Sequence, residues 1–379
     1  MNRQTLKLAI LTLLLGFAVG MLLPQLKKGE WKEWFAEEEP AITLPEGELV
    51  SDAFSIKLLQ TALQTPEYPV TYVCPAAMTA ALHEIETLSK GAAIEQIQAL
   101  GLSSQNSSTA EIYLLSAMDA DLPNFNGKGT LLPLPFRSNY PEAVSTFNSF
   151  FGFSAADSAN TSPDTRFFMA TRTVGNAVFR VPFYAADSKT GDFENADGGI
   201  PAVRLMRRCG QFRTAEAADG SWKAVALMLD NSRADAALVA VLPQGNVRDF
   251  ALSLNPSILS DIRRALAEST PQELTVEMPK LHLSVGVRDS ASLLQALGVT
   301  APFDIRLADF SVITSEKVAL NALAESLSIV LPEEADRPAD IPSPDSGAPL
   351  FSLTRPFLWF AGDLTTPAPP AVLGIVENL

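Results

Sequence analysis

The chain has 379 residues, of which 47% are hydrophobic and 19% are charged, and its formal net charge is −15. This composition is typical of a globular protein with a sizeable core and excludes a chain that is disordered throughout. Because so acidic a chain lacks the basic surface that nucleic-acid binding requires, no nucleic-acid partner is expected.

The first residues predict export. Arg3 and Lys7 precede an apolar run over residues 8–23, a pattern shared by signal peptides and membrane anchors. Residues 1–25 are therefore interpreted as a signal peptide or as an anchor that attaches the chain to a membrane through 8–23. Residues 26–48 form an acidic spacer. Both alternatives place the remainder outside the cytoplasm, either secreted or membrane-anchored.

The folded domain is predicted to cover residues 49–379, and it opens with helical patterns. "FSIKLLQTAL", "AAMTAALHEIETL" and "AAIEQIQAL" carry apolar residues at helical spacing, and "VTYVC" predicts a short strand that ends before Pro75. Residues 103–165 are rich in Ser, Asn and Pro, and no element is assigned there.

From Arg166 onward, strand patterns dominate. The predicted strands are "RFFMATRTVGNAVFRV", "AVRLMRRCGQFRTAEA", "WKAVALML", "AALVAVLP", "ELTVEMPKLHLSV", "ESLSIVL" and "RPFLWFAG". "VRDFALSL", "ILSDIRRALAES" and "SASLLQALG" predict helices, the last closed by Gly298. Helices followed by strands with scattered helices favour the α+β class over repeated strand-helix-strand units.

Residues suited to catalysis or metal binding are scarce. Cys74 and Cys209 are the only cysteines and His83 and His282 the only histidines, so no metal and no cofactor are expected. The cysteines are interpreted as buried free thiols and the histidines as surface or structural residues. A Lys-Thr-Gly triplet at 189–191 has no accompanying Ser-x-x-Lys, and the chain is predicted not to be an enzyme.

Several segments together resemble one known family. They are "VGNAVF", "RLMRRCGQF", "VEMPKLHL", "VRDSASLLQALGVTAPFDIRLADFSVIT" and "RPFLWFAG" with "AVLGIVEN". In this order they are similar to conserved stretches of the serpin family. The resemblance implies a serpin fold, in which helices surround three β-sheets and an exposed reactive-centre loop lies near the C-terminus. It also implies that Asn176 is hydrogen-bonded in the central sheet and that Phe310 is buried.

The resemblance gives the polar, proline-rich segment 333–353 a role as the reactive-centre loop, with a serine or cysteine protease as partner of a monomeric chain. Family spacing leaves two candidate scissile positions open, Asp345-Ser346 and Pro349. The segment that corresponds to the hinge of the loop comprises Glu333, Glu334, Ala335, Asp336, Arg337, Pro338, Ala339 and Asp340.

The hinge departs from the small residues of inhibitory members. Pro338 and Pro342 cannot donate ladder hydrogen bonds, and Asp336 and Asp340 resist burial, so both oppose insertion of the loop into a sheet. Cys74, Ala77 and Glu325 also replace polar residues that the family uses where its central sheet opens. Two functions therefore remain, a protease inhibitor and a non-inhibitory binding module, carrier or protease substrate; an exported enzyme is a third, weaker alternative.

Overall fold

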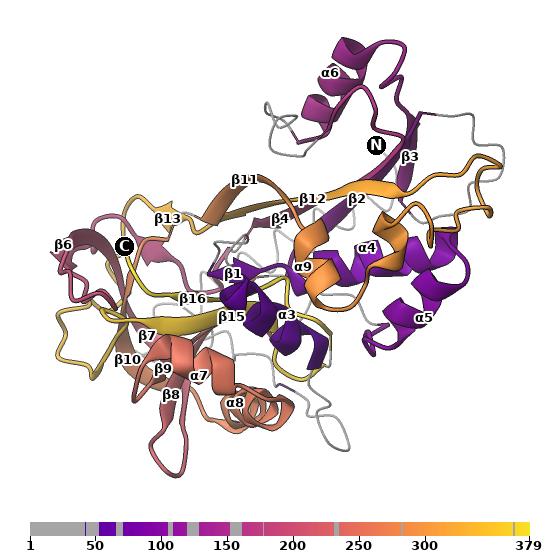
Figure 1. Ribbon diagram of the computed structural model, residues 1–379. Helices are drawn as coiled ribbons and strands as arrows, with labels where there is room; N and C mark the ends of the chain where they lie inside the picture. Colours follow the sequence, from indigo (N-terminus) through magenta and orange to yellow (C-terminus); the bar gives the residue numbers. More distant parts are fainter. Residues whose placement is uncertain are drawn as a thin grey trace, which may run out of the picture. The chain divides into compact units, whose positions relative to one another are not determined.

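The computed structural model describes residues 42, 53–65, 71–104, 109–119, 129–151, 161–176, 178–230, 235–281, 283–366 and 368–379. They belong to a unit that covers residues 42–379 (Figure 1). The helices are α3 (Ala53–Gln64), α4 (Pro75–Leu88), α5 (Ala92–Gln98), α6 (Tyr140–Phe151), α7 (Val247–Ser253), α8 (Pro256–Glu268), α9 (Ala291–Ala296) and the 3-10 turn η2 (Ala301–Phe303).

The strands of the described residues form three sheets, as the α+β serpin prediction requires. The strands are β1 (Tyr72–Val73), β2 (Glu111–Met118), β3 (Thr130–Pro133), β4 (Phe167–Asn176), β5 (Phe183–Tyr184), β6 (Lys189–Asp192), β7 (Ala202–Glu216), β8 (Trp222–Met228), β9 (Ala236–Pro243), β10 (Gln272–Pro279), β11 (Leu283–Asp289), β12 (Leu320–Val330), β13 (Glu333–Glu334), β14 (Leu350–Ser352), β15 (Phe357–Asp363) and β16 (Val372–Val376).

The largest sheet has nine strands in the order β1-β16-β15-β9-β8-β7-β10-β14, with β6 also paired to β7. The strand β7 belongs to both halves of this sheet. Its residues 205–212 pair antiparallel with β10, and its residues 213–216 pair with β8. A single long strand therefore ties the ladder beneath the C-terminal loop to the core of the protein.

The five-stranded sheet has the order β11-β12-β4-β2-β3. Its central strands β4 and β12 run parallel, and their ladder extends from the pair Phe167–Leu320 to the pair Asn176–Val330. The helix α6 packs on one face, where the rings of Phe147 and Phe168 meet edge to face at a centroid distance of 4.8 Å (Figure 1). A third, two-stranded sheet pairs β13 with β5 in parallel.

The burial of β9 shows how the sequence builds the core. All of its residues are buried, and its two faces contribute to two different clusters of the hydrophobic core. Alternation along the strand places Val239 in the core cluster that contains Leu259 of α8, and Ala240 in the cluster that contains Leu327 of β12. A continuous apolar run is the expected pattern for a strand that is covered on both faces.

Local capping explains where α7 and α8 begin. The side chain of Asn246 accepts hydrogen bonds from the backbone N–H groups of residues 248 and 249 at the start of α7. Asn255 accepts from the N–H of Ile258 at the start of α8, and proline stands at the first position of that helix. Both asparagines satisfy N–H groups that the first helical turn leaves without partners.

Three sequence-based expectations about elements require correction. The strand predicted over "RFFMATRTVGNAVFRV" ends at Asn176 with β4, and Phe179 beyond it forms an isolated bridge with Leu229. The segment 103–165, left unassigned, contains β2, β3 and α6. The run "ELTVEMPKLHLSV", predicted as one strand, forms two strands, because β10 ends at Pro279 and β11 begins at Leu283 in a different sheet. The helical patterns at the start of the domain and the short strand before Pro75 are confirmed.

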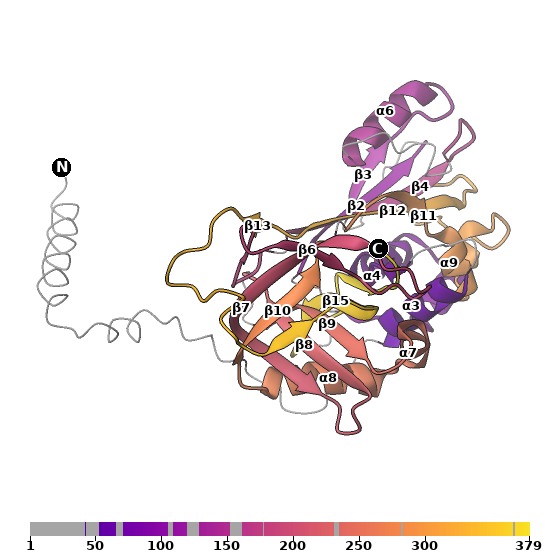
Figure 2. The same ribbon diagram turned by 90° about the vertical axis from the view of Figure 1, so that its left-hand side faces the viewer.

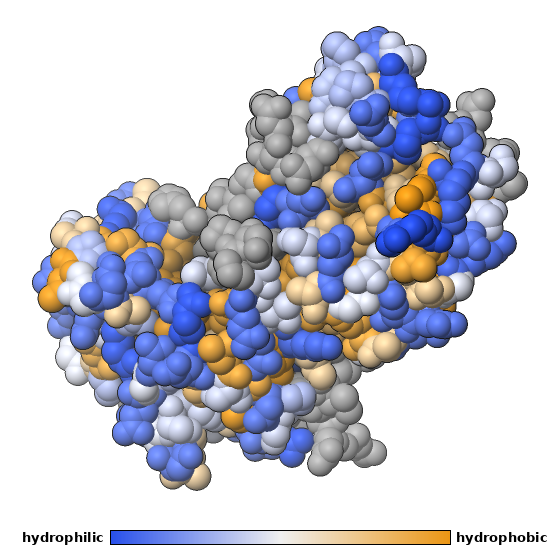
Figure 3. Space-filling model, viewed as in Figure 1, coloured by the Kyte–Doolittle hydropathy of each residue, from blue (hydrophilic) through white to orange (hydrophobic). Residues whose placement is uncertain are grey.

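Large exposed hydrophobic side chains are scattered over the described surface. They are Tyr113, Val178, Ile200, Ile305, Leu307, Val330, Leu350 and Leu379. Figure 3 shows one face, on which hydrophilic side chains divide the hydrophobic surface into small patches. A broad apolar patch would indicate a protein interface, and this face does not carry one. The monomeric state stays a prediction.

The predicted signal peptide or anchor and most of the acidic spacer lie outside the described residues. Within the described ranges, no helix is long and apolar enough to cross a membrane.

Candidate functional site

The candidate site is the loop of residues 333–353, which leaves the sheets after β12 and returns at β14. Figure 2 shows this loop as a long excursion between β13 and the β7–β10 ladder. Most side chains between Glu334 and Leu350 are exposed, but Arg337, Ile341, Ser343 and Ala348 are half-buried and Pro344 is buried. The exposed, polar character expected from the sequence is therefore found over most of the loop.

The first hinge residue, Glu333, is fixed by a cluster of donors. Its side chain is only 3% exposed, and its carboxylate accepts from Lys280 Nζ at 2.5 Å and from Arg204 Nη2 at 3.3 Å. The hydroxyl of Ser188 donates a further hydrogen bond. Burial alone would raise the pKa of Glu333, but these donors outweigh it and hold the pKa below its ordinary value. The loop therefore starts from an anchored carboxylate.

We expect this anchor to weaken in acid. Because the folded pKa of Glu333 is depressed, its ionised form stabilises the hinge above the ordinary glutamate pKa of about 4.3, and this contribution disappears as pH falls through the folded value. Amide hydrogen exchange at the hinge is measured in the wild type and in a Glu333→Gln variant at the same series of pH values. As the pH falls below about 4.3, the ratio of the wild-type rate to the variant rate should rise. An identical acid step in Glu333→Gln would contradict this assignment.

The hinge after Glu334 forms a polar turn. Ala335, Asp336, Ala339 and Asp340 are exposed. The guanidinium of Arg337 pairs with Asp187 at 3.0 Å and also donates to the carbonyl of Ile341. The N–H of Ile341 donates to the carbonyl of Pro338 at 3.1 Å, which closes a turn. This part of the loop is bent rather than extended in the structure.

The distal half of the loop, which holds the candidate scissile positions, lies against β7 and β10. Asp345 pairs with Arg207 at 2.9 Å, and the hydroxyl of Ser346 lies 3.5 Å from the sulfur of the buried Cys209. The backbone N–H of Thr275 donates to the carbonyl of Pro349 at 2.8 Å. The Asp345-Ser346 bond therefore lies in a turn that is fastened to the sheet.

The sheet next to the hinge is closed. Asn176 and Val330 pair at the end of the β4–β12 ladder nearest the loop, and no segment of the described chain lies between these strands. The side chain of Asn176 lies outside the described residues, so its amide hydrogen bond stays a prediction. Phe310 is 2% exposed and packs edge to face on Phe167 at 4.8 Å.

A buried charged cluster lies between the five-stranded sheet and α4. Glu325 of β12, 2% exposed in its side chain, pairs with Arg288 of β11 at 2.8 Å and accepts from Ser290 at 2.9 Å. The guanidinium of Arg288 lies 5.0 Å from the ring centroid of Tyr72. Burial, followed by the nearby carboxylate of Glu325, raises the pKa of the Cys74 thiol well above its ordinary value. Sequence reasoning singled out Glu325 and Cys74 but missed Arg288.

The cysteines and His83 lie in surroundings that are typical of structural residues. Both cysteines are buried and free, as predicted. The imidazole of His83 contacts Glu86 and the carbonyl of Ser103, and His282 lies outside the described residues. Within the part of the chain that is described, no group of three or more His, Cys, Asp or Glu side chains could hold a metal ion.

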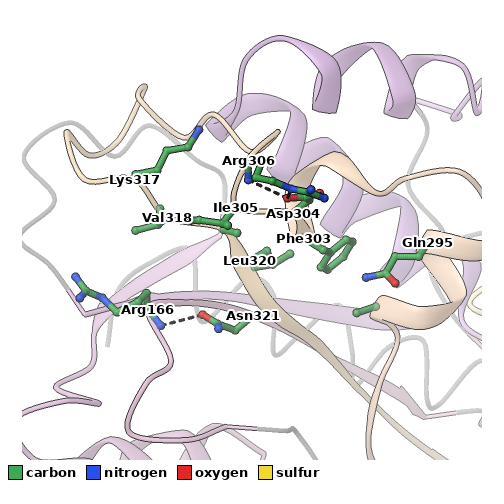
Figure 4. Close-up of a pocket in the computed structure, with 12 residues that line it drawn as sticks. Arg166, Gln295, Phe303, Asp304, Ile305, Arg306, Lys317, Val318, Leu320 and Asn321 are labelled. Atoms are coloured by element: carbon green, nitrogen blue, oxygen red, sulfur yellow. Dashed lines mark hydrogen bonds and ion pairs between the residues drawn. The ribbon is translucent and has the colours of Figure 1, made fainter.

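A cavity of about 600 Å³ lies where β4 and β12 begin (Figure 4). Asn321 accepts from the N–H of Arg166 at 2.9 Å, and Arg306 pairs with its near neighbour Asp304 at 2.6 Å on one side of the cavity. Lys317 donates to the carbonyl of Ala308 at 2.6 Å. Because its cationic side chains already have partners in the protein, this cavity is a weaker candidate site than the loop.

A model of the serpin family, described as serine protease inhibitors, matches residues 155–374, which is more than half of the chain. The chain belongs to the serpin family. Members of this family are typically inhibitors without enzymatic activity. The interpretation of residues 333–353 as the reactive-centre loop stays a prediction.

Solved serpin structures resemble this one. Native protease nexin-1 with heparin has a TM-score of 0.70 and 16% identity, covering 87% of this chain and 98% of that chain. Uncleaved ovalbumin has a TM-score of 0.72 and 16% identity, covering 88% of this chain and 100% of that chain. Mouse protein-Z dependent protease inhibitor has a TM-score of 0.72 and 15% identity, covering 87% of this chain and 96% of that chain. No curated protein matches the sequence. At these identities the likeness shows the fold alone.

Proposed function

We propose that this serpin presents its 333–353 loop to a serine or cysteine protease and is cleaved there as a substrate. The fold then acts as a binding module, and cleavage does not trap the protease. The observation that carries this proposal is the hinge, in which Asp336, Pro338, Asp340 and Pro342 alternate along the chain. In an extended strand these four residues share one face.

Insertion of such a strand between β4 and β12 is unfavourable for two reasons. A middle strand needs backbone donors toward both neighbours, and each proline removes one donor whichever face it occupies. If the shared face turns toward the core, Asp336 and Asp340 are buried without partners, which costs about 3 kcal/mol for each carboxylate. Arg337 would also have to leave Asp187, its partner in the structure.

A trapping inhibitor is the second candidate, and one observation favours it. The loop lies outside a closed five-stranded sheet, with its first residue anchored by Lys280 and Arg204. An inhibitor that traps by insertion must start from this arrangement, because the inserted strand has to be absent before cleavage. The two functions therefore share a starting state and differ in the fate of the loop and the protease after cleavage.

Incubation with a panel of serine and cysteine proteases, followed by denaturing electrophoresis, separates the two functions. We expect cleavage within residues 335–349 and no SDS-stable complex with any protease. A chemically inactivated sample of each protease serves as control and should leave the loop intact. An SDS-stable complex would contradict the substrate proposal and establish the inhibitor, whereas failure of every protease to cut the loop would contradict both.

We also infer that the domain is exported, because Arg3 and Lys7 precede the apolar run of residues 8–23. An alkaline-phosphatase fusion placed after Glu48 should be active, because the reporter folds only outside the cytoplasm. The matched control is the same fusion without residues 1–25, which should be inactive. Equal activity of both fusions, or none in either, would contradict export by this segment.

A further inference from the structure

A second cavity, of about 510 Å³, shares two residues with the anchor of the hinge. Lys280 and Arg204, which hold Glu333, both line it. The cavity lies between the ends of β7 and β10 on one side and β1, β15 and β16 on the other. Its lining residues are Thr71, Tyr72, Val203, Arg204, Pro279, Lys280, Leu281, Trp359, Ile375, Val376, Glu377, Asn378 and Leu379.

The walls of this cavity are mainly apolar. Trp359, 2% exposed, lies 6.4 Å from Tyr72 between ring centroids, and Leu281 and Ile375 are buried beside them. A volume of this size falls within the range of about 300–1,000 Å³ that is typical of small-molecule sites. The cavity can therefore enclose the hydrophobic body of a small ligand.

The polar groups at the cavity favour an anion. Lys280 and Arg204 contribute two positive charges, and the carboxylate of Glu333 is the one anion that pairs with both, while Arg204 also donates to the carbonyl of Ala185 at 3.4 Å. The acidic lining residue Glu377 is already paired with Arg248 at 2.5 Å. A single carboxylate is therefore paired with two cations, and the donors of these cations have the capacity to bind a second carboxylate.

We propose that this cavity binds a small amphipathic carboxylate. Its hydrophobic body packs against Trp359, and its carboxylate competes with Glu333 for Lys280 and Arg204. Because the same cations serve the ligand and the hinge, binding loosens the anchor of the loop. By linkage, the factor by which the ligand shifts the hinge toward release equals the ratio of its affinities for the protein with a released hinge and with an anchored hinge.

Titration with sodium decanoate, followed by isothermal calorimetry and tryptophan fluorescence, tests the site. We expect saturable binding of decanoate, and binding of decanol at least tenfold weaker because it lacks the charge. Lys280→Gln together with Arg204→Gln should weaken decanoate at least tenfold. Lys189→Gln, which changes a lysine outside the cavity, is the matched control and should change nothing. Equal binding of decanoate and decanol, or of the wild type and the double variant, would overturn the proposal.

The variant Glu333→Gln supplies a readout that does not depend on protein stability. It removes the competing carboxylate, so decanoate should bind several-fold tighter, and decanol should not change. Fluorescence quenching should be lost in Trp359→Phe while calorimetric binding persists. Unchanged or weaker decanoate binding to Glu333→Gln would overturn the competition. None of these measurements involves a protease, so their outcome is independent of the proposed substrate function.

Discussion

A hinge variant that carries Asp336→Thr, Pro338→Ala, Asp340→Ala and Pro342→Ala is expected to gain thermal stability when its loop is cut, whereas the nicked wild type is not. The substitutions restore two backbone donors and remove two carboxylates from the face that they share. Each ladder hydrogen bond of an inserted strand contributes about 0.5–1.5 kcal/mol. Since about 1 kcal/mol shifts the Tm of a large domain by roughly 2–4 °C, nicking should raise the Tm of the variant by about 5 °C or more.

The matched control carries Arg337→Ala and Ile341→Ala, which alter the opposite face of the same segment and leave both prolines in place. Its Tm should stay nearly constant on nicking. Thermal melts before and after limited proteolysis compare the three proteins, and electrophoresis confirms that each loop is cut. A steep rise in the nicked wild type would refute the argument from the prolines. An absent rise in the hinge variant would show that another barrier, such as the buried Arg288–Glu325 pair, keeps β4 and β12 closed.

Arg288→Met is the substitution with the largest expected loss of stability. It leaves the buried carboxylate of Glu325 without its cation and removes the contact with the ring of Tyr72. Breaking one side of a buried ion pair typically costs about 3–5 kcal/mol. Denaturant unfolding followed by circular dichroism should show a loss of this order in the free energy of unfolding.

A double-mutant cycle separates the pair from the loss of packing. In Arg288→Met with Glu325→Met, no charge remains unpaired, so most of the stability should return. Arg306→Ala removes one partner of the exposed pair with Asp304 and should have little effect. A double variant as unstable as Arg288→Met would contradict the electrostatic explanation.

Elements that carry a local pattern were predictable from the sequence. The apolar run of β9 and the helix before Gly298, whose φ of +95° suits glycine, needed no information beyond their own residues. The segment 103–165 was not predictable in this way. There, β3 pairs in parallel with β2 from across a long connection, and α6 depends on packing against Phe168 of β4. Such tertiary contacts are not encoded in the local spacing of residues.

The candidate site shows the same division. Its polarity, its prolines and the acidic pair at Glu333 were evident from the sequence. The anchors were not, because Ser188, Lys280 and Arg204 come from three segments that only folding brings to Glu333. The contact of Asp345 with Arg207 likewise joins residues far apart in the chain. A charge on a loop predicts exposure, whereas its partner is set by the fold.

The thiol of Cys209 lies directly beneath the distal part of the loop, fully buried and 3.5 Å from the hydroxyl of Ser346. A cut that frees Ser346 from β7 would uncover this sulfur to solvent, while Cys74 stays enclosed beside α4. The chain therefore contains its own chemical reporter. The thiol of Cys209 should react with alkylating reagents when the loop detaches and should not react while the loop stays in place. The mass added by alkylation therefore distinguishes molecules whose loop has detached from those whose loop has not.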